Sequence, residues 1–346
     1  MNYPKISLAL DTVSLIKRWI TPQEWMGAIE KIGGIYCIEA STDNEIDPFL
    51  TTKSYIKDWI SNVARLQAEH GFKVVSFYSG YVTYRSCGLT HPDKRIRRKL
   101  LNGWFKPVVD IASELNAEVG CNLNAFSEHM LSNETEYARA VQRLEESLCI
   151  AADYAADKHV RFSYEQMYTP TQGNWTIEEC RKRMRRIYSM ANAPMYITLD
   201  AGHAIGQKEF FKTEQSEMSK DYLSAGQKDA DVYEWLRELG RYSPIIHLQQ
   251  TDGRTSSHRP FTQKWNETGI IHPKKVLAAL KESFEREQDI TLPGPAEEIH
   301  LVFEPFFSIT EPAEDIIAQI RETVAYWRIA VPRDGIRLDE IDLGGK

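Results

Sequence analysis

The strongest constraint on this chain is an alternation of strand-like and helix-like segments that repeats eight times along 346 residues. Short runs rich in β-branched and other apolar residues predict strands, and longer segments with apolar residues at three- and four-residue spacing predict helices. The predicted strands are 5–10, 35–40, 73–80, 118–124, 159–165, 195–200, 244–250 and 300–306. The helices predicted between them include 54–71, 134–156 and 231–240, and the sequence TIEE at 176–179 predicts the capped start of another.

Strands that are apolar throughout and separated by helices indicate a parallel sheet covered on its outer face. Eight such units favour an α/β fold, a closed (β/α)₈ or TIM barrel, over an open sheet. We predict a single catalytic barrel domain over residues 1–332 and a polar C-terminal tail over 333–346. The tail is expected to fold over the barrel, to contact another subunit or to be loose.

Composition excludes several classes of protein. A hydrophobic content of 42% supports a large core, and a net charge of −7 without a basic half argues against nucleic acid as a partner. The five cysteines are scattered and form no C-x-x-C pair, which argues against a zinc knuckle or a disulfide framework. The N-terminus lacks the pattern of a secretory signal, and no run of 18 apolar residues occurs. We therefore expect a cytoplasmic protein without a membrane partner.

Two long loops follow predicted strands, at 206–229 and 251–270. Active sites of TIM barrels lie at the carboxyl ends of the strands, and long loops in compact domains often act as lids or binding loops. Both loops are therefore expected at the active-site face, as a closing lid or as a surface for a partner subunit.

Four consecutive predicted strands each carry a side chain of the metal-ligand type near the carboxyl end. These residues are Glu165, Asp200, His247 and Glu304. One such acid is ordinarily a helix cap or a salt-bridge partner, but the ends of barrel strands converge above the core, so the four side chains should meet. Three carboxylates and one imidazole suit Mn²⁺, Mg²⁺, Co²⁺ or Zn²⁺. Without a cation, the carboxylates would repel one another and some would protonate.

These four residues, with DAGH at 200–203, HLQQTDG at 247–253 and FEP at 303–305, resemble the xylose isomerase-like barrel superfamily over about residues 5–330. That superfamily includes ketose 3-epimerases, sugar-phosphate isomerases and epimerases, and DNA repair enzymes of the endonuclease IV type. The resemblance implies that Glu165, Asp200, His247 and Glu304 hold one divalent cation, with Mn²⁺ the first choice. It also implies that Glu165 and Glu304 are the catalytic acid–base pair on opposite faces of the substrate.

The resemblance implies an isomerase or epimerase of a small sugar or sugar phosphate. Loss of a proton beside the ketose carbonyl gives a metal-stabilised cis-enediolate. Return of the proton to the opposite face gives epimerisation, and its transfer to the adjacent carbon gives isomerisation. The segment SSHRPF at 256–261 resembles the substrate-gripping loop of sugar-phosphate members and favours a phosphorylated substrate.

Further residues are expected to handle the carbohydrate substrate. The predicted substrate-binding residues are His203, Gln249, Arg254, His258 and Arg259. Weaker candidates at the same mouth are Arg85 and His91, Trp19 and Tyr78 as apolar walls, and Glu39 as a group that orients the substrate or a ligand.

Two other enzymatic functions stay open at this point. A lyase or deglycosidase acting on a 3-keto sugar uses the same proton abstraction and often needs a partner subunit. An endonuclease IV-like enzyme requires three metals and an Asp-x-His after the seventh strand, whereas the sequence after His247 runs LQQTDGRTSSH. A non-enzymatic scaffold would have no need of two glutamates beside a metal. A homo-oligomer or a small partner subunit is possible in each case.

Overall fold

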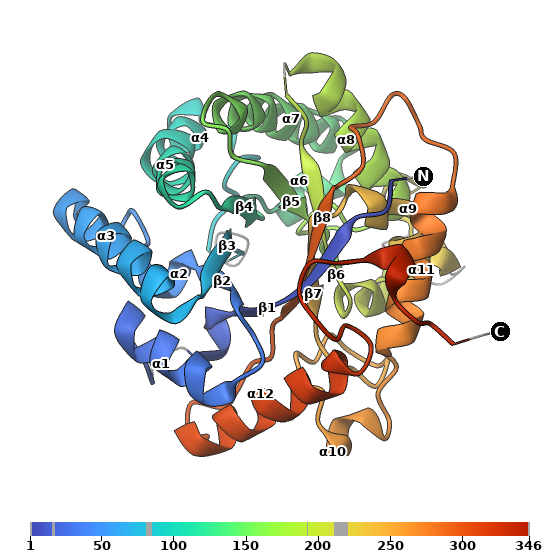
Figure 1. The fold of residues 1–346 in the computed structure, drawn as a ribbon. Helices are drawn as coiled ribbons and strands as arrows, with labels where there is room; N and C mark the ends of the chain where they lie inside the picture. The colour runs from blue at the N-terminus through green and yellow to red at the C-terminus, as the bar shows by residue number, and fades with distance from the viewer. Residues whose placement is uncertain (1, 16–17, 81–84, 192, 211–220, 345–346) are drawn as a thin grey trace.

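The computed structural model describes residues 2–15, 18–80, 85–191, 193–210 and 221–344, and it confirms the predicted (β/α)₈ barrel (Figure 1). Eight parallel strands pair in sequence order, and both β8 and β2 pair with β1, which closes the barrel. The strands are β1 (Lys5–Asp11), β2 (Cys37–Ser41), β3 (Lys73–Ser79), β4 (Glu118–Cys121), β5 (Phe162–Glu165), β6 (Tyr196–Asp200), β7 (Ile245–Leu248) and β8 (Glu298–Phe303).

Four strands, β3, β4, β7 and β8, end one to three residues before their predicted limits, and at β4 and β8 polar contacts take the backbone out of the sheet. After Cys121, the Leu123 amide donates to the Tyr164 hydroxyl at 3.0 Å instead of to a neighbouring strand. After β8, the Phe306 amide donates to the His258 carbonyl at 2.8 Å, in the loop that follows β7. These exits turn the chain into the loops that surround the barrel mouth.

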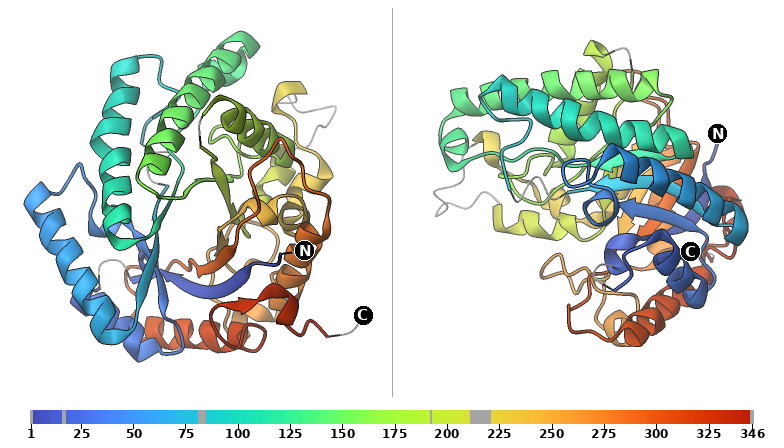
Figure 2. Two further views of the ribbon diagram at one scale, coloured as in Figure 1. Left: turned by 45° about the horizontal axis from the view of Figure 1, so that its top comes forward. Right: turned by 90° about the vertical axis from the view of Figure 1, so that its left-hand side faces the viewer.

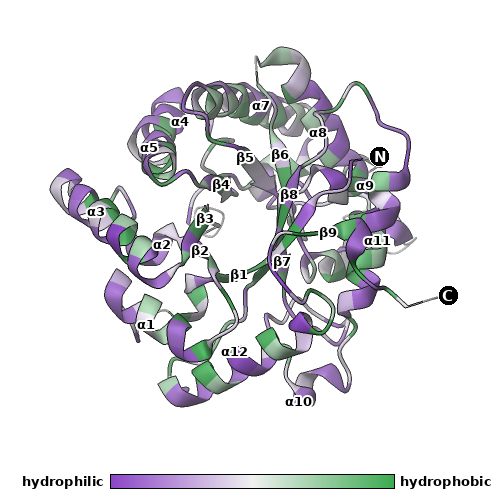
Figure 3. Cartoon of the chain, in the orientation of Figure 1, coloured by the Kyte–Doolittle hydropathy of each residue, from purple (hydrophilic) through white to green (hydrophobic). Residues whose placement is uncertain are grey.

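A ring of helices covers the barrel, and the long helices carry both hydrophilic and hydrophobic residues (Figure 3), of which many hydrophobic ones are buried in the core. The predicted helices 54–71, 134–156 and 231–240 correspond to α3, α7 and α9. The long helices are α1 (Pro22–Ile32), α3 (Lys53–His70), α5 (Lys106–Leu115), α7 (Glu134–Asp157), α8 (Ile177–Met190), α9 (Val232–Leu239), α11 (Pro273–Glu285) and α12 (Ala313–Arg328). Short helices are α2 (Thr42–Glu45), α4 (Lys94–Leu100), α6 (Glu128–Ser132) and α10 (Gln263–Asn266).

The C-terminal segment lies beside the N-terminal strand (Figure 2). Strand β9 (Ile336–Arg337) pairs antiparallel with the first residues of β1, and the Asp334 carboxylate accepts a hydrogen bond from the Leu8 amide at 2.9 Å. The described part of this segment therefore packs at the amino end of β1, away from the carboxyl end, where the ligand-type residues lie. Residues 211–220 of the predicted lid lie outside the described residues.

Two observations bear on the expected class of protein. The five cysteines, all within described segments, are unpaired, as expected. No helix within the described segments is long and apolar enough to cross a membrane.

Helix α2 follows β2 at the carboxyl end of the barrel and carries a buried carboxyl group, Glu45. Its carboxylate accepts a hydrogen bond from the Trp25 indole at 2.9 Å. Burial raises the pKa of Glu45 from 4.5 to about 8, so the folded protein holds this proton much more tightly than the unfolded chain does.

This difference predicts a pH-dependent stability that Glu45→Gln removes. The stability due to the Glu45 proton is fully present below pH 4.5 and is lost as the pH rises through about 8. Relative to Glu45→Gln, the wild type should lose about 1–3 kcal/mol of unfolding free energy between pH 6 and pH 9. Urea unfolding at both pH values measures this, and parallel pH profiles for the two proteins would contradict it.

Candidate metal centre and substrate cavity

A cavity of about 240 Å³ opens at the carboxyl ends of the barrel strands. Both predicted catalytic residues, Glu165 at the end of β5 and Glu304 just after β8, line it. The other lining residues are Asp11, Val13, Ser41, Asp43, Tyr78, Gly80, Met167, His203, His258 and Phe306. Asp200 and His247 are buried directly behind the two glutamates.

The four predicted metal ligands converge. His247 Nδ1 lies 3.3 Å from Glu165 Oε1 and 3.6 Å from Glu304 Oε2. One donor atom each from Glu165, Asp200 and His247 lies within 4.8 Å of the others. Ligands about 2.0–2.2 Å from a shared cation are themselves roughly 3 Å apart, so small side-chain adjustments would complete this set. One donor atom each from Asp200, His203 and His258 also lies within 4.8 Å of the others, so these residues form a second group that could hold a metal.

Unsatisfied buried atoms indicate where a cation fits. Within the described part of the chain, His247 Nδ1 and Glu304 Oε2 are buried and have no hydrogen-bond partner. The opposite ring nitrogen, His247 Nε2, lies 2.8 Å from Glu39 Oε1, and Ser76 donates to the other oxygen of Glu39 at 2.6 Å. A carboxylate that holds the far nitrogen of a histidine fixes its tautomer and turns the other lone pair toward a metal. These residues therefore fit a divalent cation.

The electrostatics of these carboxyl groups also fit a divalent cation. Burial raises the pKa of Glu165 and of Glu304, and the neighbouring Asp200 carboxylate raises both further. The Tyr78 hydroxyl donates to Glu165, and its ring meets the His247 ring edge-on with centroids 4.5 Å apart. Tyr78 therefore holds Glu165 in position as well as lining the cavity.

Three of the predicted substrate-binding residues lie at this site. His203 Nδ1 lies 2.8 Å from the Gln166 carbonyl, and the ring lines the cavity. His258 also lines it, stacks on Phe306 with ring centroids 4.0 Å apart, and has a pKa that burial lowers to about 4. The Gln249 side chain donates to Asp200 at 2.9 Å and accepts from the His258 amide at 2.6 Å, so it links the two.

The structure does not bring the two predicted arginines to the cavity lining. Arg254 is exposed, and Arg259 lies over the Trp265 ring and 3.5 Å from Asp252. Their roles in substrate binding stay predictions. Of the weaker candidates, Arg85, His91 and Trp19 are absent from the described lining, whereas Glu39 holds His247.

Three polar residues on the other side of the mouth were not predicted from the sequence. Asp11 ends β1, Ser41 ends β2 and Asp43 follows it, and all three line the cavity. A signal was present, because LALD at 8–11 ends in an acid just as ITLD at 197–200 does.

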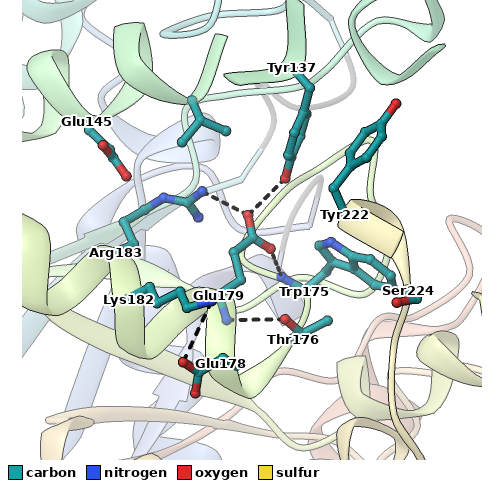
Figure 4. A pocket seen from close by; sticks show the side chains of 11 residues that line it. Tyr137, Glu145, Trp175, Thr176, Glu178, Glu179, Lys182, Arg183, Tyr222 and Ser224 are labelled. Carbon is teal, nitrogen blue, oxygen red and sulfur yellow. Dashed lines mark hydrogen bonds and ion pairs between the residues drawn. The ribbon is translucent and has the colours of Figure 1, made fainter. Parts of the chain in front are cut away.

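A larger cavity of about 460 Å³ lies between α7 and α8, outside the strand ends (Figure 4). Several of its polar groups pair with one another: the Glu179 carboxylate accepts hydrogen bonds from Arg183, Tyr137 and the Trp175 amide. Thr176 caps α8 as predicted, but the capping box is incomplete because Glu179 makes these contacts instead. Since none of the predicted site residues lines it, we assign this cavity no role in the chemistry.

The sequence matches the profile of a family described as "Xylose isomerase-like TIM barrel" over residues 27–285. The chain belongs to this family. A curated relative of this xylose isomerase-like barrel is D-erythrulose 1-phosphate 3-epimerase of Brucella abortus (strain 2308). It is 27% identical over 327 residues, covering 93% of this chain and 95% of the relative.

Solved structures of xylose isomerase-like barrels share the fold. A putative xylose isomerase from Rhodospirillum rubrum superposes with a TM-score of 0.75 at 17% identity, covering 94% of this chain and 99% of that chain. A D-allulose 3-epimerase from Methylomonas, in complex with D-allulose, gives a TM-score of 0.60 at 15% identity, covering 96% and 99%.

The geometry predicts that Asp200 and His203 differ in their effect on metal binding. Asp200→Asn should weaken Mn²⁺ binding by more than about tenfold, and Glu39→Gln by about 10–100-fold, because both disturb the ligand set around His247. His203→Ala should keep the Mn²⁺ affinity within about threefold of the wild type, because His203 is not one of the four proposed metal ligands. Calorimetric titration of the metal-free proteins with MnCl₂ measures these affinities.

The alternative donor group makes this comparison decisive. If His203→Ala loses Mn²⁺ as severely as Asp200→Asn does, the cation is held by Asp200, His203 and His258 instead.

Proposed function

We propose that this chain is a divalent-metal-dependent epimerase of a small ketose or ketose phosphate. One observation carries the proposal: Glu165 and Glu304 approach one cavity from strands that are three apart in the barrel, on either side of the unpartnered His247 Nδ1. Two carboxyl groups that face one small cavity from different sides suit removal of a proton from one face of a carbon and its return to the other.

Glu165, Asp200, His247 and Glu304 would hold the cation, with Mn²⁺ the first choice and Mg²⁺, Co²⁺ or Zn²⁺ as alternatives. When bound, a divalent cation polarises a carbonyl group and stabilises negative charge on its oxygen. The carboxylate-rich donor set supports an oxygen-preferring metal over one that prefers thiolates.

The protein's own groups would move the proton. One glutamate removes it from the carbon beside the carbonyl, and the other, in its protonated form, delivers one to the opposite face. In the metal-free protein, burial raises the pKa of both carboxyl groups. Tyr78 orients Glu165, and the ring of His203 donates to a substrate oxygen.

We infer a short ketose, phosphorylated on the carbon beside the carbonyl, as the first substrate to test. The curated relative acts on D-erythrulose 1-phosphate, and 27% identity over nearly the whole of both chains supports a related substrate. The cavity of about 240 Å³ suits a small ketose, with the phosphate toward the mouth.

The alternatives receive less support. A lyase or deglycosidase acting on a 3-keto sugar would use the same glutamates but would expel a leaving group. A nuclease of the endonuclease IV type would need an Asp-x-His after β7, and the sequence after His247 runs LQQTDGRTSSH instead. Self-association, a partner subunit and a cytoplasmic location also remain predictions, and the unpaired cysteines are consistent with a reducing compartment.

Glu304→Gln should keep the fold and lose at least about 100-fold in kcat for D-erythrulose 1-phosphate, because general acid–base help contributes about 10²–10⁴-fold. Turnover with Mn²⁺ is measured by resolving the two tetrulose 1-phosphates, and far-ultraviolet circular dichroism reports the fold. Glu298→Gln is a matched control, since Glu298 lies at the amino end of the same strand and is exposed to solvent. A Glu304→Gln enzyme that keeps more than a tenth of wild-type activity would refute the two-glutamate mechanism.

A further inference from the structure

The side of the cavity formed by β1 and β2 has polar groups that the proposed chemistry does not use. Asp11, Ser41 and Asp43 line it, and we call them the carboxylate wall. The strands follow one another around a closed barrel of eight, so β2 lies diametrically opposite β6. Asp43, just after β2, and His203, just after β6, therefore line opposite sides of the same cavity.

The carboxylate wall presents hydrogen-bond acceptors, and its negative charge lies on Asp43, because burial raises the pKa of Asp11 well above its usual range. Asp43 accepts a hydrogen bond from the Ser79 hydroxyl, and Asp11 accepts one from the Val13 amide at 2.8 Å, and these contacts hold both carboxyl groups at the wall. Asp11 is 1% exposed and Asp43 is half-buried, so a ligand in the cavity meets them with little intervening water. Neither belongs to the two donor groups that could hold a metal.

The opposite side carries imidazole rings in place of carboxyl groups. The rings of His203 and His258 line it, with centroids 6.1 Å apart, and the Ser256 hydroxyl lies 3.0 Å from the Gln249 amide nitrogen behind them. The two sides of the cavity therefore differ, with imidazole rings on the β6–β7 side and the carboxyl groups of Asp11 and Asp43 on the β1–β2 side. A phosphate group only accepts hydrogen bonds in its ionised form and is repelled by carboxylates, whereas a sugar hydroxyl can donate to them.

We propose that Asp43, with Asp11 beside it, binds the hydroxyl at the unphosphorylated end of the ketose and thereby confines the phosphate to the histidine side. This inference rests on the proposed epimerase function and assigns the wall its role in substrate specificity. For D-erythrulose 1-phosphate, the hydroxyl on carbon 4 lies at Asp43, and the phosphate on carbon 1 lies toward His203 and His258. A ketose phosphorylated on carbon 4 would bring its phosphate against the Asp43 carboxylate, and the two negative charges would repel each other.

The test compares three substrates on wild-type and variant enzymes loaded with Mn²⁺. The substrates are D-erythrulose 1-phosphate, its 4-deoxy analogue and D-erythrulose 4-phosphate. Burial raises the pKa of Asp43 to about 7, so rates are compared at pH 8, where the carboxylate form prevails. Glu45→Gln is the matched control, because Glu45 is a buried carboxyl group of the same short helix that does not line the cavity.

For the wild type, removal of the 4-hydroxyl should lower kcat/KM by about 10–100-fold, the effect of a hydrogen bond to a charged group. For Asp43→Ala, the two substrates should differ by less than about threefold, since the partner of that hydroxyl is gone. Asp43→Asn should raise kcat/KM for the 4-phosphate at least about tenfold, because like-charge repulsion is removed. Glu45→Gln should leave all substrate ratios unchanged.

Several results would overturn the inference while leaving the proposed function intact. Asp43→Ala could lower kcat/KM by the same factor for D-erythrulose 1-phosphate and for its 4-deoxy analogue. That result would mean that Asp43 only supports the structure through its hydrogen bond with Ser79. The wild type could also turn over the 4-phosphate as well as the 1-phosphate. If the wild type epimerises none of the ketoses, the proposed function fails and the inference fails with it.

Discussion

The site depends on the pairing of β8 with β1, which closes the sheet into a barrel. Six consecutive residues of each strand are in register, from Lys5 opposite Glu298 to Leu10 opposite Phe303. This pairing places Glu304, the residue after β8, next to the ends of the other strands and within 3.6 Å of His247. Without closure, Glu165 and Glu304 would stand at separate places along an open sheet edge, and no shared cavity would form between them.

Closure concentrates acidic groups in a region with little water, and the protein compensates through a few directional contacts. Glu39 and Ser76 hold the His247 ring, Tyr78 holds Glu165, and Gln249 holds Asp200. These contacts orient the donor atoms but leave His247 Nδ1 and Glu304 Oε2 unpartnered among the described residues. Buried polar atoms are ordinarily hydrogen-bonded, so two such atoms within one set of ligand-type side chains fit a cation-binding site.

Sequence reasoning succeeded where a property repeats along the chain. Apolar periodicity predicted the eight strands and the main helices, and equivalent positions at strand ends predicted that Glu165, Asp200, His247 and Glu304 lie close together. It overlooked Asp11 and Asp43, because one acid at a strand end equally suits a helix cap. It also gave no indication that Arg259 lies against Trp265, or that Ile336 pairs with Ile6, since both depend on contacts between distant segments. A two-residue strand is too short to show periodicity.

The central claim is that a proton is removed from the carbon beside a ketose carbonyl and exchanged through a buried glutamate. The most direct measurement is turnover of D-erythrulose 1-phosphate in deuterium oxide with Mn²⁺, followed by nuclear magnetic resonance of the sugar. We predict one deuterium at carbon 3 of the epimerised product, and none when both Glu165 and Glu304 are replaced by glutamine. An epimerised product that keeps its original hydrogen at carbon 3 would contradict the account.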